Sequence, residues 1–318
     1  MLEIGYTLSG EEFGPRDLVG LARRAEETGF SFALVSDHYH PWIDRQGHSP
    51  FVWSVLGGVA QVTERLRVGT GVTCPTMRIH PAIIAQAAAT AACMLPGRFF
   101  LGVGSGENLN EHILGERWPS APERLDMLEE AIDVIRLLWE GETASHRGEH
   151  FVVDHARVYT LPDEPPPIYV AAAGSRSVQL AGALGDGLIS VAPKEGLIER
   201  FRESGGEGKP VYGQLHVCWA KDEQEAIDTA REWWPNTSLP GELGAELPYP
   251  RHFEQASELV TEEIIAEQVV CGPDPERHLE AIREFERAGF DHVYVHQIGP
   301  DQEGFFRFYE AEVLPKLG

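Results

Sequence analysis

The strongest constraint on the fold is an alternation of short apolar segments with amphipathic segments along almost the whole chain. Eight segments have the length and composition of β-strands, and most precede a segment with helical periodicity. The expected strands are residues 2–6, 31–36, 66–72, 98–103, 168–172, 187–191, 211–220 and 292–297. The expected helices are residues 15–28, 52–63, 81–95, 121–140, 176–184, 275–288 and 303–317. Repeated βα units imply a parallel sheet, and eight of them close into a (β/α)8 TIM barrel.

Two segments interrupt this alternation. Residues 143–167 have the pattern of an inserted hairpin that ends in a proline cluster, and residues 234–262 hold a second insertion or lid. We therefore expect residues 1–318 to form a single barrel domain whose two insertions account for its length beyond the roughly 250 residues typical of this fold. A doubly wound sheet is the alternative, but no GxGxxG motif follows the first strand.

The charge balance limits the partners of the protein. The 318 residues include 50 acidic and 26 basic side chains, a formal net charge of −24 at pH 7. Nucleic acids and anionic membranes both require a basic patch, so we expect neither as a partner, whereas an anionic small molecule needs only a few local donors. The chain has no signal-peptide pattern, no long apolar run and no disulfide or zinc-like cysteine spacing. We therefore expect a cytoplasmic protein.

Polar, titratable and glycine residues follow the expected strands, which is where the active site of such a barrel is assembled. In chain order they are Ser9, Glu11 and Glu12; residues 36–42; residues 73–76; residues 104–110; residues 173–176; residues 192–194; and His296 with Gln297. A barrel with a purely structural role would not need this pattern.

His38 can be interpreted in more than one way. With His40 it forms an HxH pair, but a barrel metallohydrolase would need a further ligand at the end of the fifth strand, where Ala173 and Gly174 stand, so we predict no metal site. His38 could instead share proton transfer with Glu107 across the barrel mouth, since partial burial raises the pKa of a carboxyl group. Equally, His38 could cap a strand and Glu107 could pair with an arginine.

The residues after the fifth strand have two readings as well. Gly174, Ser175 and Arg176 open an expected helix, whose free N–H groups would favour a phosphate. The alternative is an ordinary N-cap formed by the serine.

Several motifs together resemble one known family. They are Val35-Ser36-Asp37-His38 with Pro41-Trp42, residues 47–51, residues 68–72 with Pro75-Thr76, residues 81–87, residues 100–107 with Leu109-Asn110-Glu111, and residues 168–172. The combination of SDH-x-x-PW with GVGSGE is specific. The chain resembles the luciferase-like flavin and deazaflavin superfamily, and within it the coenzyme F420-dependent glucose-6-phosphate dehydrogenases.

That resemblance implies a homodimeric TIM barrel that binds coenzyme F420 and transfers a hydride from a sugar, possibly a sugar phosphate, or another alcohol to C5 of F420. By position, His38 would take the hydroxyl proton, Glu107 would manage the proton on the deazaflavin and Trp42 would position the reacting carbon, with Glu11 in the same pocket. The implied cofactor-binding residues are Asp37, Gly71, Val72, Thr73, Gly106, Glu107, Asn110, Ala172, Ala173 and Gly174, with a cis peptide bond between Gly71 and Val72.

The sequence departs from those enzymes where they bind the sugar phosphate. Lys194 matches one of their basic residues, but two others fall near the neutral Gln255 and Gln268, and a hydroxyl residue is replaced by Val191. Losing two charge-assisted contacts argues against glucose 6-phosphate as the substrate, although Arg251 or Arg176 could substitute. Two alternatives stay open. An FMN-dependent monooxygenase is disfavoured by the SDH/PW and GSGE motifs, and a non-catalytic flavin-binding relative by the presence of His38, Trp42 and Glu107.

Overall fold

The computed structural model describes residues 2–191, 193 and 196–317. Its main element is a closed ring of eight parallel strands: β1 (Glu3–Leu8), β2 (Phe32–Val35), β3 (Arg67–Thr70), β4 (Phe99–Val103), β7 (Ile168–Ala171), β8 (Gly187–Ser190), β9 (Val211–Cys218) and β11 (His292–Gln297). Pairing of β8 with β9 and of β11 with β1 closes the ring. The predicted (β/α)8 barrel is confirmed.

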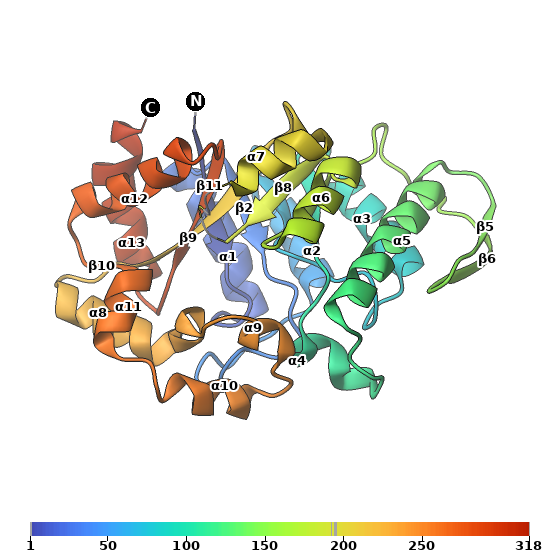
Figure 1. Cartoon of the computed structure of the whole chain (residues 1–318). Helices are drawn as coiled ribbons and strands as arrows, with labels where there is room; N and C mark the ends of the chain where they lie inside the picture. Colours follow the sequence, from blue (N-terminus) through green and yellow to red (C-terminus); the bar gives the residue numbers. More distant parts are fainter. Residues whose placement is uncertain (1, 192, 194–195, 318) are drawn as a thin grey trace.

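Helices surround this ring (Figure 1). The predicted helices are present as α1 (Pro15–Thr28), α2 (Val52–Val62), α3 (Pro81–Met94), α5 (Ala121–Trp139), α6 (Ser175–Leu184), α12 (Pro275–Arg287) and α13 (Gln302–Phe308). In α1, α3, α5 and α12 a proline occupies the first turn, where its missing N–H would have had no partner in the helix.

The expectations for the helices were incomplete. They omitted the short α4 (Asn108–Glu111) and α7 (Leu197–Phe201), and also α8 (Glu223–Trp233), although the Asp222 side chain caps α8 by accepting from Glu225 N. The last expected helix is helical as far as Lys316, but it changes from α-helix to π and 3-10 turns after Phe308.

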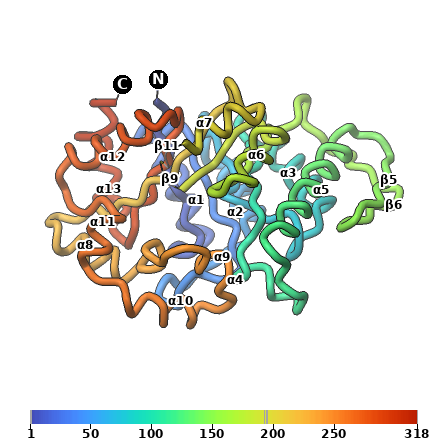
Figure 2. The backbone as a smooth tube through the Cα atoms, in the orientation of Figure 1, coloured from blue at the N-terminus to red at the C-terminus, as the bar shows by residue number. Residues whose placement is uncertain are grey.

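The two predicted insertions differ in position. The first contains an antiparallel hairpin, β5 (Ala144–Arg147) with β6 (Val152–Ala156), which projects away from the barrel (Figure 1). The second contains η3 (Pro235–Ser238), α9 (Leu243–Glu246), α10 (Pro250–Ser257) and α11 (Glu262–Gln268), before the short β10 (Val270–Cys271). Figure 2 shows this second segment passing below the barrel to reach α4 (Asn108–Glu111). Asn108 Nδ2 donates to Glu246 O at 3.0 Å there, so the insertion crosses the C-terminal mouth.

An aromatic layer fills the barrel interior beneath that mouth. It consists of Phe32, Leu34, Phe100, Tyr169, Ile189, Tyr212 and Tyr294. Glycines on neighbouring strands give the rings room, since a Cβ at Gly5 would lie 2.4 Å from the Phe32 ring and one at Gly69 would lie 2.0 Å from the Phe100 ring. This layer therefore closes the barrel interior beneath the mouth.

Candidate active site

The C-terminal ends of the strands open into a cavity of about 1290 Å³, which extends beyond the barrel mouth to residues of α11 and α12. This volume exceeds the roughly 300–1,000 Å³ of an ordinary small-molecule pocket, and only part of it lies within the mouth. All four residues expected to be catalytic line it: Glu11, His38, Trp42 and Glu107. Of those expected to hold the cofactor, the lining includes Asp37, Gly71, Val72, Gly106, Glu107, Asn110, Ala172, Ala173 and Gly174.

The remaining expected site residues lie elsewhere. Thr73 is fully buried, and its Oγ1 donates to Asp37 Oδ2 at 2.7 Å, so Thr73 stands behind Asp37 and does not line the cavity. Lys194 lies outside the described residues. Gln268 and Val191 line the cavity.

The arginines suggested as substitutes for the missing basic residues do not face the cavity. Arg176 pairs with Asp126 beside α6, and Arg251 lies over the Tyr249 ring, 5.1 Å from its centroid. Whether either arginine contacts a substrate stays a prediction.

His38 lies between two carboxylates. Its Nδ1 is 3.4 Å from Glu11 Oε1 and 3.3 Å from the carbonyl oxygen of His40, and its Nε2 is 3.3 Å from Glu107 Oε2. Two acceptors around Nδ1 favour the tautomer with hydrogen on that atom, which leaves Nε2 to accept a hydrogen bond from the protonated form of Glu107. The Trp42 ring packs beside it, with centroids 5.0 Å apart.

Both carboxylates that face His38 are held in place. Glu11 is buried and its Oε2 accepts from Ser36 Oγ at 2.7 Å. Glu107 accepts from Asn110 Nδ2 at 3.0 Å, and the Oδ1 of the same amide accepts from the backbone N–H of Tyr39 at 2.9 Å. Burial raises the pKa of Glu107, while His38 opposes the shift. Glu107 thus contacts His38 and Asn110, and the alternative in which it pairs with an arginine is not the arrangement found.

His40 plays a different part from His38. Its Nδ1 bonds to the carbonyl oxygen of Leu109 at 2.9 Å, and its ring stacks on His112 with centroids 5.7 Å apart. His40 therefore packs the loop after β2 against α4. Within the described ranges, no group of three or more His, Cys, Asp or Glu side chains is arranged to hold a metal ion.

A buried ion network supports this loop from behind, and the sequence analysis missed its central residue, Arg78. Arg78 Nη2 donates to Asp37 Oδ1 at 2.8 Å, and its Nε lies 3.6 Å from Glu111 Oε1. All three side chains are buried, and burial raises the pKa of Glu111 to about 7 although Arg78 opposes the shift. The available signal was that Arg78 is the one basic residue in the loop after the third strand.

Backbone geometry shapes the same wall. The peptide bond between Gly71 and Val72 is cis, as expected. Gly106 has a φ of 83°, a left-handed conformation that side chains rarely adopt, and it lines the cavity beside Glu107.

The N-terminus of α6 opens onto the cavity at Gly174. Gly174, not Ser175, is the N-cap residue, so the serine-cap alternative is wrong. Ser177 Oγ accepts from Gly174 N at 3.2 Å. Arg200 Nη1 donates to Ser175 Oγ at 2.6 Å, which places an unanticipated guanidinium beside the first turn of the helix. Free backbone N–H groups together with a cation can bind an anion.

Proteins of known activity are similar to this chain in sequence. Residues 2–292 match the model of a family described as luciferase-like monooxygenase. The chain belongs to this family. An F420-dependent glucose-6-phosphate dehydrogenase of Beutenbergia cavernae is 37% identical to it, over 100% of the chain and 98% of the relative.

Two solved structures extend the comparison of this luciferase-like chain. An F420-dependent secondary alcohol dehydrogenase, in complex with an F420–acetone adduct, superposes with a TM-score of 0.92 at 31% identity and covers 98% of both chains. An F420-dependent tetrahydromethanopterin reductase from Methanopyrus kandleri has a TM-score of 0.81 at 23% identity, covering 100% of this chain and 99% of its own, which shows the shared fold.

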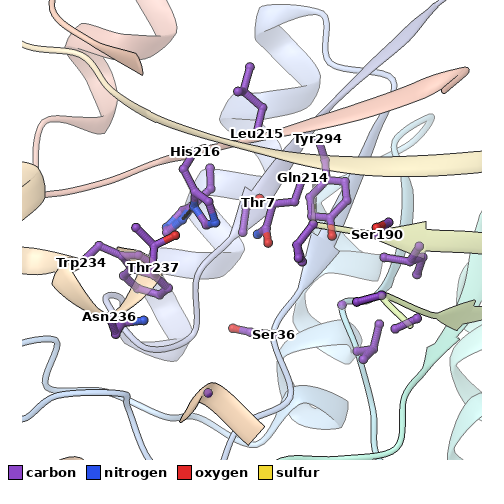
Figure 3. Close-up of a pocket in the computed structure, with 18 of the residues that line it drawn as sticks. Thr7, Ser36, Ser190, Gln214, Leu215, His216, Trp234, Asn236, Thr237 and Tyr294 are labelled. Atoms are coloured by element: carbon purple, nitrogen blue, oxygen red, sulfur yellow. Dashed lines mark hydrogen bonds between the residues drawn. The ribbon is translucent and has the colours of Figure 1, made fainter. Parts of the chain in front are cut away.

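The opposite wall of this luciferase-like barrel holds polar residues that the sequence analysis did not assign to the site. Figure 3 shows Thr7, Ser190, Gln214, His216, Asn236, Thr237 and Tyr294 around the open space. Gln214 and His216 alternate with Leu215 on β9, and this period of two was the available signal. Behind His216 lie His296 and Glu12, both buried.

Proposed function

We propose that this protein is an F420-dependent dehydrogenase that transfers a hydride from the C–OH carbon of a sugar or another alcohol to C5 of coenzyme F420. The observation that carries the proposal is His38, held between Glu11 and Glu107 at the wall of the cavity into which the strand ends open. The named activities of the similar proteins support the same reaction class.

The cavity residues fit such a cofactor. Gly174 has only Ser177 Oγ near the position of a Cβ, at 3.9 Å, so a side chain there would occupy the space in front of α6. We propose that this N-terminus and Arg200 hold the phosphate of the F420 tail, and that the wall of Gly71, Val72 and Gly106 lies against the ring. Asp37, Thr73 and Asn110 support that wall, and Ala172 and Ala173 continue it. Bound F420 would supply the carbon that accepts the hydride.

The protein's own part is proton handling and orientation. We propose that His38 Nε2 takes the proton of the substrate hydroxyl while Glu11 orients the ring through Nδ1. Glu107, whose pKa is raised by burial, can hold and release a proton closer to neutral pH than an exposed glutamate can. Trp42, packed between His38 and the Phe253 ring, would restrict where the reacting carbon sits. Lys194 stays proposed as the residue that would meet a negatively charged substrate group.

Titration of the protein with F420 and, separately, with FMN tests the cofactor, because binding changes the fluorescence of either molecule. We expect saturable binding of F420, followed by its reduction when a panel of sugars, sugar phosphates and secondary alcohols is added. Binding of FMN alone would contradict the proposal and favour a monooxygenase. F420 binding without reduction by any alcohol would favour a non-catalytic relative.

We further propose that residues 1–318 work as one domain in a cytoplasmic homodimer. The barrel strands run from Glu3 to Gln297, so no part of the chain is a separate barrel unit. Phe51, Ile83 and Met94, near the ends of the adjoining helices α2 and α3, are 52%, 57% and 40% exposed, and we propose that these two helices contact the second copy. Light scattering after size-exclusion chromatography should show a dimer that Ile83→Glu weakens; a monomer at all concentrations would contradict this.

A further inference from the structure

A chain of hydrogen bonds leads from a buried carboxyl group to the cavity. Glu12 Oε1 accepts from Gly299 N at 2.8 Å, and its Oε2 lies 2.8 Å from His296 Nε2. The other nitrogen of that ring, His296 Nδ1, is 3.0 Å from His216 Nδ1. Glu12 and His296 are almost completely buried, whereas His216 is only partly covered. The chain therefore ends at His216, and the proposed hydride transfer makes no use of it.

His216 lines the cavity. On β9 the side chain of Leu215 belongs to the core outside the sheet, so the alternate residues Gln214 and His216 point into the barrel. Figure 3 shows both on the cavity side and Leu215 turned the other way. His216 Nδ1 is bonded to His296, so Nε2 is the atom left for a ligand.

The direction of the hydrogen bonds that link Glu12, His296 and His216 decides whether His216 Nε2 carries a hydrogen. When Glu12 is ionised, His296 Nε2–H donates to it, so His296 Nδ1 accepts from His216 Nδ1–H and His216 Nε2 is a bare acceptor. One added proton reverses this. Whether it resides on Glu12, His296 or His216, the chain then leaves a hydrogen on His216 Nε2. The gain is one proton, and each neutral ring only exchanges one tautomer for the other.

We propose that His216 is a substrate-binding residue whose Nε2, set as donor or acceptor by the Glu12–His296–His216 chain, binds an uncharged hydroxyl group of the substrate. A hydroxyl both donates and accepts, so it satisfies Nε2 in either state of the chain, whereas a phosphate or carbonyl satisfies only the donor state. This inference rests on the proposed dehydrogenase function and narrows its substrate.

The position of His216 indicates that this hydroxyl is not the reacting one. His38 follows β2 and His216 lies on β9, three strand positions apart in the order β9, β11, β1, β2. At about 4.8 Å per strand their backbones are on the order of 10 Å apart across the barrel. The inference therefore assigns the two histidines to different hydroxyl groups of one substrate, as on a sugar or polyol.

The surroundings of Glu12, His296 and His216 favour the uncharged form of each side chain. Burial raises the pKa of Glu12 to about 8, and it lowers the pKa of His216 to about 3 and that of His296 to about 4. The titratable groups that face Glu12 are Glu11, Tyr6, Cys218 and His296. The added proton is therefore lost as the pH rises through about 8, so Nε2 is a donor below that pH and an acceptor above it.

Nitrogen NMR of protein with 15N-labelled histidine tests the switch without any turnover. Between about pH 6 and pH 10, two units either side of the pKa of Glu12, we expect the His216 Nε2 signal to move from the range of a protonated to that of an unprotonated ring nitrogen. The variant His216→Phe identifies the signal by its loss.

Two further variants sharpen this test. In Glu12→Gln the amide oxygen keeps Gly299 N, so the NH₂ group faces His296 and holds His216 Nε2 in the protonated state at every pH. Glu130→Gln is the matched control, because Glu130 also lies 2.8 Å from a histidine Nε2, that of His146, but on the distant hairpin. We expect it to titrate like the unmodified protein. An unchanged Nε2 signal over the whole range, or identical titrations for Glu12→Gln and Glu130→Gln, would overturn the inference.

Steady-state kinetics with F420 test the substrate class. For a sugar or polyol, His216→Phe should raise KM about three- to tenfold, the usual effect of one hydrogen bond, while a monohydroxylic alcohol such as 2-propanol shows no difference. An equal effect on both kinds of substrate, no effect on either, or turnover restricted to monohydroxylic alcohols would overturn the inference alone. Failure to bind F420 would instead overturn the proposed function, and this inference with it.

Discussion

The two walls of the barrel mouth are built from different chemistry. The wall formed by the loops after β2, β3 and β4 contains charged groups in fixed contacts, with Arg78 between Asp37 and Glu111, and His38 between Glu11 and Glu107. The wall formed by β8, β9, β11 and η3 presents neutral groups, among them Gln214, His216 and Thr237. We refer to these as the charged wall and the neutral wall.

This difference in chemistry indicates which wall is held in a single arrangement. Buried ion pairs hold a loop in one arrangement, because breaking them leaves charges without water or partners. Neutral donors and acceptors can meet different hydroxyl patterns at small cost. The charged wall therefore suits a cofactor and a proton transfer that need fixed groups, and the neutral wall suits the hydroxyl groups of a substrate.

The largest expected effect concerns proton transfer at the charged wall. His38→Ala should lower kcat for alcohol oxidation by about 10²–10⁴-fold, the usual contribution of a general base, with little change in the F420 dissociation constant. Stopped-flow absorbance of F420 measures the first and fluorescence titration the second. The control His40→Ala removes a packing contact in the same loop and should cost less than about tenfold. Equal losses in the two variants would show that the loop, not the His38 ring, matters.

The second effect concerns the stability of the charged wall. Arg78→Ala leaves the carboxylates of Asp37 and Glu111 buried without their partner, so the free energy of unfolding should fall by about 3–5 kcal/mol. Denaturant titration followed by circular dichroism measures it. Arg176→Ala breaks the exposed pair with Asp126 and should change stability by about 0–1 kcal/mol. Similar values for both would mean that the charged wall is not rigidly held.

The third effect is a dependence of stability on pH that both walls share. The folded pKa values of Glu12, about 8, and Glu111, about 7, are above the ordinary value of 4.5. Between pH 4.5 and these values the two carboxyl groups hold more protons in the folded protein than in the unfolded chain, so their contribution to the free energy of unfolding falls as the pH rises. The glutamine in Glu12→Gln does not titrate, so the contribution of Glu12 to this pH dependence is absent from the variant.

Thermal unfolding of the unmodified protein and Glu12→Gln across this pH range measures the dependence. We expect the stability of the variant relative to the unmodified protein to increase with pH. A constant difference would mean that Glu12 does not titrate in the folded state within this range.

The smallest expected effect concerns the cofactor tail, at the border between the walls. Arg200 is exposed, so Arg200→Ala should weaken F420 binding by about three- to tenfold, and more at low salt than at high salt. Fluorescence titration at two salt concentrations measures this, with Arg23→Ala on α1 as an exposed control. Binding that is the same for both variants would exclude Arg200 as a contact of the tail.

Much of the fold could be predicted because its signals are local. A helix such as Pro15–Thr28 begins with a proline and ends before a glycine, and each of these residues restricts its own backbone. The expected elements do not include α8, although Asp222 precedes it, because they assign a strand before this segment and a lid after it and no element to the segment itself. The position of His38 opposite Glu107 was predictable as well, since both follow strands whose carboxyl ends meet at one rim.

The networks behind the walls could not be predicted in this way. Arg78 reaches Asp37 across 41 positions of sequence, and His296 reaches Glu12 across 284. No residue near Glu12 in the sequence indicates that its carboxyl group bonds to a histidine. In so acidic a chain, an acidic residue would instead be expected to face water.

By itself the sequence determined the order of strands and helices, the closed parallel barrel and the rim at which Glu11, His38, Trp42 and Glu107 gather, because backbone preferences and hydrophobic periodicity act over a few residues. Only the tertiary structure decided which side chains are removed from water together. Closing the barrel brings β1 against β11 and β11 against β9, and that closure alone places Glu12, His296 and His216 in one hydrogen-bonded chain. The energies of such groups depend on burial and on distances of a few ångströms, and these exist only once distant segments have packed.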